Sequence, residues 1–358
     1  MIADTRAKAT GKGATSVFPA RRTLPIAYGA LFLIGSMLVG LLIGPAHLGL
    51  DAIVRALLSH VPFLGVRSHL SQSDSAILWQ LRAPRVVLGM LVGGMLAIAG
   101  ASYQGVFRNP LADPYLLGIA AGAGLGATLA IVYGHGAVEA YDLIPLAAFA
   151  GAAGGATCSY LLGRSAMAGS NTASLILAGV TVMSFLTAIQ TFVQQQHAES
   201  LQEVYSWILG RLDTAGWHDV GLVAPYIGVS AIVLLLHRRA LDVLSVGDEE
   251  AASLGINVNR TRLVIVVFAT IGTAAAVAIS GLIGFVGIIV PHAIRLVLGP
   301  SYRLILPLAL LGGAGFLVLA DVIARSILSP AELPIGVVTA FFGAPFFAVI
   351  LRTSRSFR

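Results

Sequence analysis

Charge is scarce in this chain. Only 11% of its 358 residues are charged, whereas an average soluble domain carries roughly 25%. Hydrophobic residues make up 57%, and the mean hydropathy is +0.89. A soluble fold of this size has too little interior for so much apolar surface, so we exclude one and expect a chain that lies in a lipid bilayer. Glycine is frequent, at 41 residues, which suits helices that pack closely in membranes.

Cysteine and recognisable catalytic motifs are nearly absent as well. The single cysteine, Cys158, excludes a disulfide framework or a thiolate metal cage within one chain. The segment Thr10-Gly11-Lys12-Gly13 lacks the upstream glycine and the Ser or Thr of a phosphate-binding loop. No paired carboxylates or Ser-His-Asp arrangement stand out. We therefore predict no catalytic residue, no metal ligand and no cofactor bound by this chain, so that energy for any pumping comes from a partner or an ion gradient.

The formal net charge of +6 does not indicate a nucleic-acid partner. The arginines are scattered at the ends of apolar runs, whereas a nucleic-acid-binding protein gathers them on one polar face. We therefore exclude nucleic acid and expect membrane lipid around the chain.

Long apolar runs dominate the sequence. About 20 apolar residues cross a bilayer. Ten runs are predicted as transmembrane helices: 24–44, 86–107, 115–133, 142–163, 172–194, 219–237, 262–280, 284–298, 304–326 and 335–351. The eighth run is short and begins after Ser280-Gly281, so nine spans with one long seventh helix is the alternative. Either way we predict an all-α polytopic membrane protein.

The basic residues give these spans an orientation. With ten spans, 16 of the 22 Lys and Arg residues fall on one side, which the positive-inside rule makes cytoplasmic. A nine-span chain would put the basic carboxyl tail outside. The predicted organisation is a cytoplasmic basic leader (1–23), a transmembrane domain (24–352) with outer loops 45–85 and 195–218 and an inner loop 238–261, and a cytoplasmic tail (353–358).

Two segments suggest an internal repeat. Residues 96–118 align without gaps on residues 277–299, with identical residues at seven positions. Five predicted spans separate the copies, so they would run in opposite directions through the membrane. Inverted repeats of this kind recur in transporters.

The inner loop contains a pattern typical of a short capped helix. Gly247 precedes acidic residues that suit a first helical turn, and Gly255 can end the helix. A solvated loop and a knob that docks into another protein both remain open.

The centres of the predicted spans are almost free of charge, and Asp321 is the main exception. It lies four residues before Arg325, a spacing that places both on one helix face. A helix-end ion pair and a proton relay both fit this spacing. A carrier driven by an ion gradient generally places several acidic or histidine groups at mid-membrane, so a stand-alone secondary carrier is a weak hypothesis.

Several segments, in order along nearly the whole chain, resemble one permease family. They are LRAPR (81–85), FRNPLADPYLLG (107–118), LILAGV (175–180), EEAASLGI (249–256), GFVGIIVPHAIRLVLGP (284–300), LADVIAR (319–325) and ELPIGVVTAFFGAPFF (332–347). Together they resemble the FecCD family, the permease subunits of binding-protein-dependent ABC importers for iron–siderophores, haem and cobalamin. The resemblance implies the type II ABC importer fold.

The resemblance also implies an assembly. We expect a homodimer in the bacterial inner (plasma) membrane, with both termini cytoplasmic. Two ATP-binding cassette subunits would dock on the cytoplasmic side and hold the ATP and magnesium. A periplasmic or lipid-anchored substrate-binding protein would deliver the cargo from outside. The chain itself would be a transport subunit and not an enzyme.

The resemblance assigns roles to individual residues. Arg82, Arg85 and Arg325 match positions that dock the binding protein, although snorkelling to headgroups or local pairing is the alternative. Asn109 and Leu111, with Asn171 and Thr172 from a less certain alignment, match a cytoplasmic gate. For Asn109 the alternative is a simple turn cap. The resemblance assigns contact with the ATPase to six residues of the inner loop: Glu249, Glu250, Ala251, Ala252, Leu254 and Gly255.

The expected function is import of an iron chelate, either haem or a ferric siderophore, driven by ATP hydrolysis on partner subunits. Cobalamin is the alternative cargo of the same class. The motifs do not choose among these cargoes, because relatives line their pathway with small and apolar residues.

Overall fold

The computed structural model describes residues 20–44, 46, 48–59, 70–134, 140–165, 172–213 and 215–354. All regular secondary structure within them is helical. Ten helices lie at the ten predicted spans: α1 (Ala20–Leu42), α4 (Ala83–Phe107), α5 (Ile119–Tyr133), α6 (Ala140–Ser165), α7 (Thr172–Gln196), α9 (Trp217–Leu236), α12 (Val258–Ser280), α13 (Val286–Leu298), α14 (Tyr302–Ser326) and α15 (Ile335–Ser354).

Seven of these helices, within the part of the chain that the structure describes, are long and apolar enough to cross a membrane. The other three, α5, α13 and α15, are apolar but shorter. Apolar run length therefore placed each of these helices correctly, because a helix in lipid satisfies its own backbone hydrogen bonds.

The nine-span alternative is wrong. Helix α12 ends at Ser280, and Gly281 follows with φ +68°. A β-carbon at Gly281 would clash with the backbone oxygen of Trp207, so both the positive φ and this close approach require glycine. Helix α13 begins only at Val286, after non-helical residues 281–285. The seventh and eighth runs are therefore two separate helices.

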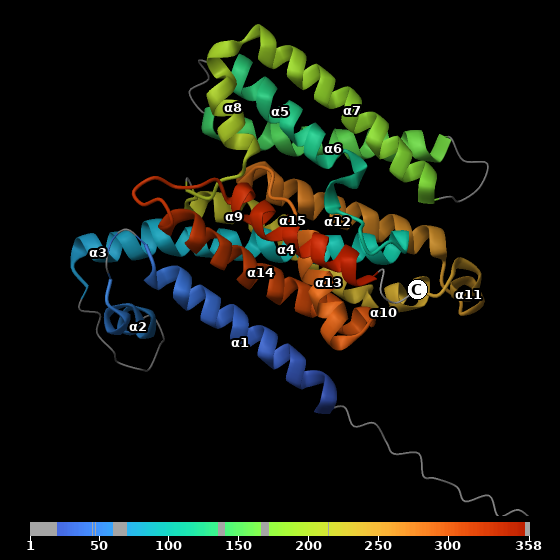
Figure 1. Cartoon of the computed structure of the whole chain (residues 1–358), viewed down its shortest axis with the longest axis horizontal. Helices are drawn as coiled ribbons and strands as arrows, with labels where there is room; N and C mark the ends of the chain where they lie inside the picture. The colour runs from blue at the N-terminus through green and yellow to red at the C-terminus, as the bar shows by residue number, and fades with distance from the viewer. Residues whose placement is uncertain are drawn as a thin grey trace, which may run out of the picture.

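Shorter helices occupy the predicted loops. They are α2 (Leu50–Leu58), α3 (Gln72–Ala76), η1 (Ile77–Arg82), η2 (Pro114–Leu117), η3 (Ala198–Ser200), α8 (Leu201–Ile208), α10 (Arg238–Leu244) and α11 (Asp248–Ser253). Figure 1 shows α2 and α3 at one end of the long axis and α10 and α11 at the opposite end. The predicted docking arginines and the predicted ATPase contact therefore lie at opposite ends of the molecule.

Helix α4 forms the centre of the bundle. Most of its residues are buried, and α9, α12, α13 and α14 pack against it. A β-carbon at Gly93 would clash with the backbone oxygen of Gly313, so α4 and α14 approach each other as closely as glycine allows. Helix α1 packs on the far side of α14, while α5, α6 and α7 form a second group beside α12 (Figure 1).

Helix α7 leaves much of its apolar surface uncovered. Leu177, Phe185 and Phe192 are 68%, 65% and 64% exposed. Apolar side chains exposed to this extent along a long helix require lipid or another protein around them.

Candidate functional site

The predicted outer end of the bundle, which carries α2 and α3, is organised around the side chain of Arg85. Its guanidinium lies 2.8 Å from a carboxylate oxygen of Asp321 on α14 and 2.7 Å from one of Glu332 in the loop before α15. The Arg85 Nη1 group also donates to Glu332 Oε1 at 3.0 Å, so the pair with Glu332 is bidentate. Paired charges and planar geometry make this a strong type of hydrogen bond.

Arg82 and Arg325 hold the end of helix α1. Arg82 donates to the backbone oxygens of Leu41 and Leu42 at 2.8 and 3.1 Å, and also to that of Ala46. Arg325 donates to the oxygen of Gly40 at 2.6 Å. The last carbonyl groups of a helix have no partner within it, so these arginines supply the missing donors.

The predicted i,i+4 pair is present, but it is not the shortest contact of Asp321. Arg325 Nε lies 3.4 Å from Asp321, whereas Arg85 lies 2.8 Å away. Asp321 therefore joins α4 to α14, and the helix-end ion pair is the arrangement found in this structure.

These contacts bear on the predicted docking role. Arg82 and Arg325 are 4% and 3% exposed, so an incoming protein meets little of either side chain in this conformation. The Arg85 side chain is 12% exposed, and Glu332, which pairs with it, is 34% exposed. Docking through these arginines remains a prediction, and it requires Arg85 to change partners.

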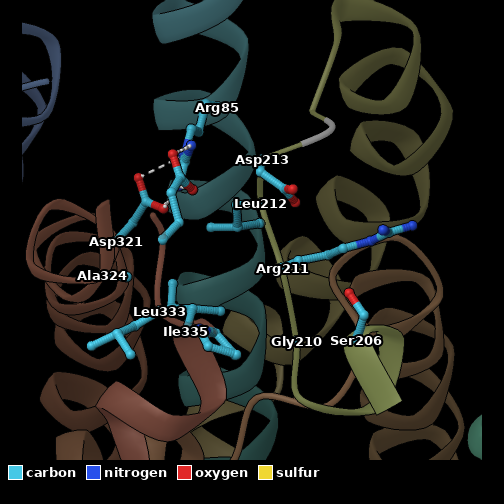
Figure 2. Close-up of a pocket in the computed structure, with 12 residues that line it drawn as sticks. Arg85, Ser206, Gly210, Arg211, Leu212, Asp213, Asp321, Ala324, Leu333 and Ile335 are labelled. Carbon is cyan, nitrogen blue, oxygen red and sulfur yellow. Dashed lines mark hydrogen bonds and ion pairs between the residues drawn. The ribbon is translucent and has the colours of Figure 1, made fainter. Parts of the chain in front are cut away.

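A small cavity of about 90 Å³ lies beside this cluster, lined by residues of α4, the 210–213 segment, α14 and the loop before α15. Figure 2 shows Arg85 directed toward Asp321, while the Arg211 side chain points away from both. Asp213 also lines the cavity. The predicted outer end thus presents both signs of charge around this cavity.

The predicted gate residues Asn109 and Leu111 lie in the turn after α4. Arg108 has φ 49°, and Asn109 donates its N–H to the oxygen of Gln104 at 3.1 Å, which ends the helix. The Asn109 side-chain oxygen accepts from the N–H of Leu111 at 2.9 Å. Asn109 therefore caps the turn, which was the simpler alternative, and Leu111 is 50% exposed.

The other half of the predicted gate is not placed. Asn171 and the side chain of Thr172 lie outside the described residues. The gate therefore stays a prediction.

The segment that follows this turn is tied to the break before α13. The Tyr115 hydroxyl donates to the oxygen of Ile283 at 3.0 Å and accepts from its N–H at 3.1 Å. Gln104 donates to the oxygen of Gly287 at 3.3 Å. The two segments predicted as inverted copies are thus in direct contact, although their repeat relationship remains a prediction.

Asp113 begins η2 in this segment and accepts from the N–H of Tyr115 at 2.7 Å. Burial raises the pKa of the Asp113 carboxyl to about 6, because burial favours the uncharged form more than this hydrogen bond favours the charged one.

The predicted short capped helix is α11. Glu249, Glu250 and Ala252 are exposed, and Leu254 beyond the helix is 70% exposed. Gly255 has φ +81° and donates to the oxygen of Ala252, so it ends the helix as expected. Ala251 is fully buried, so it offers no surface to a partner in this conformation, and its assignment as a contact residue stays a prediction. It seats α11 against the bundle.

Asp248, the first residue of α11, connects this helix to the membrane helices. It lies 3.2 Å from Arg108 at the end of α4 and 3.1 Å from Arg262 in the first turn of α12. Asp248 therefore links α11 to the end of α4, next to the turn that carries Asn109.

Sequence reasoning missed Asp248, Arg108, Arg262 and Glu332. Asp248 and Glu332 lie within or next to segments singled out for other residues. Their partners are far away in sequence, so no local spacing could have revealed the ion pairs.

Comparison with known proteins agrees with this architecture. The model of the FecCD transport family matches residues 31–353. The uncharacterized ABC transporter permease protein YvrB of Bacillus subtilis is 39% identical over 324 residues, which cover 90% of this chain and 92% of that protein. The cobalamin import system permease protein BtuC of Halobacterium salinarum is 42% identical, with 78% and 74% covered. The hemin transport system permease protein HmuU of Yersinia pestis is 37% identical, with 82% and 90% covered.

Solved structures show the same fold. A metal-chelate type ABC transporter, described in an inward-facing conformation, superposes with a TM-score of 0.80 and 28% identity over 92% of this chain and 99% of that one. PsaBC from Streptococcus pneumoniae shares the fold at a TM-score of 0.51 and 15% identity, over 74% of this chain and 89% of that one. The fold is that of an ABC importer permease, and the chain belongs to the FecCD transport family.

Proposed function

We propose that this chain is the membrane-spanning permease subunit of an ABC importer that carries an iron chelate, either haem or a ferric siderophore. The observation that carries the transport role is the placement of α11. It is an exposed helix at one end of the bundle, it is joined by Asp248 to α4 and α12, and it lies at the end opposite Arg85. This arrangement suits a subunit that receives motion at one end and cargo at the other.

The partners follow from the exposed surfaces. Leu254 and Val246, which lie on either side of α11, are 70% and 71% exposed. Exposed apolar side chains of this kind favour contact with another protein, which we take to be an ATPase subunit. Two such subunits, which hold ATP and magnesium, would serve a homodimer of this chain. The uncovered apolar face of α7 supports the second copy, and the Arg85 cluster supports a substrate-binding protein with acidic contact residues.

The gate assignment belongs to the same proposal. Asn109 and Leu111 lie at the end of α4 that Arg108 links to α11, so a displacement of α11 reaches them through one ion pair. Two-fold symmetry would bring both copies of this turn toward one axis together with Asn171 and Thr172. Small polar groups and one leucine can close such a pathway without a fixed charge that would retain a large chelate.

The cargo proposal rests on the relatives. Those named for an iron chelate carry ferric citrate, hemin or an iron chelatin, and one at 42% identity is named for cobalamin. All of these cargoes are bulky and preassembled. Cobalamin is therefore the second candidate. We place the chain in a bacterial inner membrane with both termini cytoplasmic.

The test is uptake by proteoliposomes that contain this chain, its co-encoded ATPase and its co-encoded binding protein. Haem, a ferric siderophore and cobalamin are supplied one at a time with ATP inside or outside the vesicles. We expect ATP-dependent accumulation of one iron chelate. Accumulation of cobalamin alone would reassign the cargo, whereas accumulation without the ATPase would reject the importer proposal.

A further inference from the structure

A basic cavity lies between the helix ends on the side of the bundle that carries α11. Its volume is about 500 Å³, and residues of α4, α6, α7 and α12 line it. Three of its lining residues are Arg164 in the last turn of α6 and Arg260 and Arg262 in the first turn of α12. Among the described residues that line it there is no aspartate or glutamate.

The positive charge of this cavity is poorly compensated. Among the described residues, Arg164 and Arg260 form no ion pair. Arg262 pairs with Asp248, but its Nε atom is buried and has no hydrogen-bond partner in the described part of the chain. The amino-terminal end of α12 adds further positive potential, because its first N–H groups and the helix dipole favour an anion. The described residues of the cavity therefore carry an excess of positive charge.

Part of the cavity lining is apolar and consists of Leu175 on α7 with Leu263 and Val266 on α12. Leu175 and Val266 are buried, whereas Leu263 is 41% exposed, so the apolar lining reaches the surface of the bundle at Leu263. Contact with these apolar side chains removes hydrophobic surface of an acyl chain from water and so stabilises its binding, whereas a small hydrated anion has no apolar surface to bury.

We propose that this cavity binds the headgroup of an anionic phospholipid. The phosphate lies among Arg164, Arg260 and Arg262, and the first part of an acyl chain lies along Leu263 and Val266. Basic cavities between transmembrane helices at the cytoplasmic face commonly hold anionic headgroups. Asn257 and Asn259 also line the cavity and supply amide donors to the headgroup. Arg262 lines the cavity and also pairs with Asp248, the first residue of α11. The bound lipid therefore stabilises the position of α11 against the bundle.

The experiment measures lipid binding to the purified full-length chain by native mass spectrometry. Phosphatidylglycerol is compared with phosphatidylcholine of the same acyl chains, and the wild-type chain is expected to retain phosphatidylglycerol selectively. In the double variant Arg164→Gln/Arg260→Gln the affinity for phosphatidylglycerol should fall about fivefold for each arginine. Arg262 is left intact, because its pair with Asp248 is structural.

The matched control is Arg238→Gln/Arg239→Gln, which removes the same charge from α10 at the same end of the bundle but outside the cavity. Its lipid affinity should equal that of the wild-type chain. An equal loss in the control would show attraction by net charge alone and would overturn the proposal.

Two further readouts separate the lipid from a free anion and from misfolding. Millimolar inorganic phosphate should leave phosphatidylglycerol bound, and displacement by phosphate alone would make this a small-anion site and overturn the proposal. The comparison of the two lipids on the wild-type chain needs no variant. Equal retention of phosphatidylcholine would therefore also overturn it, even if the arginine variants failed to fold.

Discussion

The carboxylate of Asp248 lies 3.2 Å from the guanidinium of Arg108 and thereby joins the exposed helix α11 to the end of the central helix α4. Arg262 on α12 contacts the same carboxylate at 3.1 Å. Buried side chains pack α4 into the bundle over most of its length, whereas at this end an ion pair links it to α11. The interaction provides a physical route from a partner at α11 to the turn that carries Asn109.

The substitution Asp248→Asn should reduce coupling more than stability. Both ion pairs are partly exposed, so each contributes at most about 1 kcal/mol to the free energy of unfolding. The quantity to measure is cargo imported per ATP hydrolysed, and a loss of about 1 kcal/mol in coupling corresponds to roughly a fivefold decrease. Asp51→Asn breaks the exposed pair with Arg55 at the other end and should leave this ratio unchanged. An unchanged ratio in Asp248→Asn would remove α11 from the coupling route.

The substitution Arg82→Gln should destabilise the chain. It removes donors to Leu41, Leu42 and Ala46 and leaves buried carbonyl oxygens unpaired, at a cost of about 1–3 kcal/mol. Thermal unfolding in detergent should show a lower Tm, whereas Arg55→Gln, at an exposed pair, should not. If Arg82 serves docking alone, the variant will keep its Tm and lose affinity for the binding protein.

Removal of the Glu332 carboxylate should strengthen the docking of an acidic binding protein. In this structure Glu332 holds Arg85 with two hydrogen bonds of 3.0 and 2.7 Å, and an incoming carboxylate has to compete with it. With Glu332→Gln we expect faster association and an affinity roughly fivefold higher, equivalent to about 1 kcal/mol. Glu203→Gln removes the same charge from the exposed surface of α8 and serves as the control. Weaker binding in Glu332→Gln alone would mean that Glu332 orients Arg85 for docking.

Stability should fall with rising pH because of Asp113. The folded chain holds a proton on this carboxyl up to about pH 6, whereas the ordinary pKa is 3.8. Between these two values the folded state binds more protons than the unfolded state, so the free energy of unfolding decreases as the pH rises. Asp113→Asn should remove this part of the slope in thermal unfolding, since the amide oxygen can still accept from Tyr115. An identical slope in the variant would show that Asp113 titrates normally.

Hydropathy alone predicted the ten apolar helices, seven long and three shorter, because a segment in lipid must satisfy its own backbone hydrogen bonds and therefore forms a helix. The break between α12 and α13 was the one uncertain point. Ser280-Gly281 indicated it, and the positive φ of Gly281 explains it. The sequence also predicted the short helix α11, because acidic residues mark its first turn and Gly255 follows its end.

The roles of charged residues were much harder to predict. The spacing of Asp321 and Arg325 indicated their pair, but Arg85, 236 residues away in sequence, makes the shorter contact with Asp321. Nothing in the sequence indicated that Arg82 hydrogen-bonds to carbonyl groups of α1, because every residue offers the same backbone oxygen. Long-range contacts of this kind depend on how the helices pack.

The most direct test of the central claim is ATP-driven uptake with the variant Leu254→Asp in proteoliposomes that hold the complete transporter. Leu254 is 70% exposed, so the change leaves the fold intact, but it buries an unpaired charge wherever α11 meets the ATPase. Leu50→Asp, at the exposed start of α2 on the opposite end, is the control. We predict that Leu254→Asp loses both co-purification of the ATPase and uptake, while Leu50→Asp keeps both. Normal co-purification and normal uptake in Leu254→Asp would contradict the account.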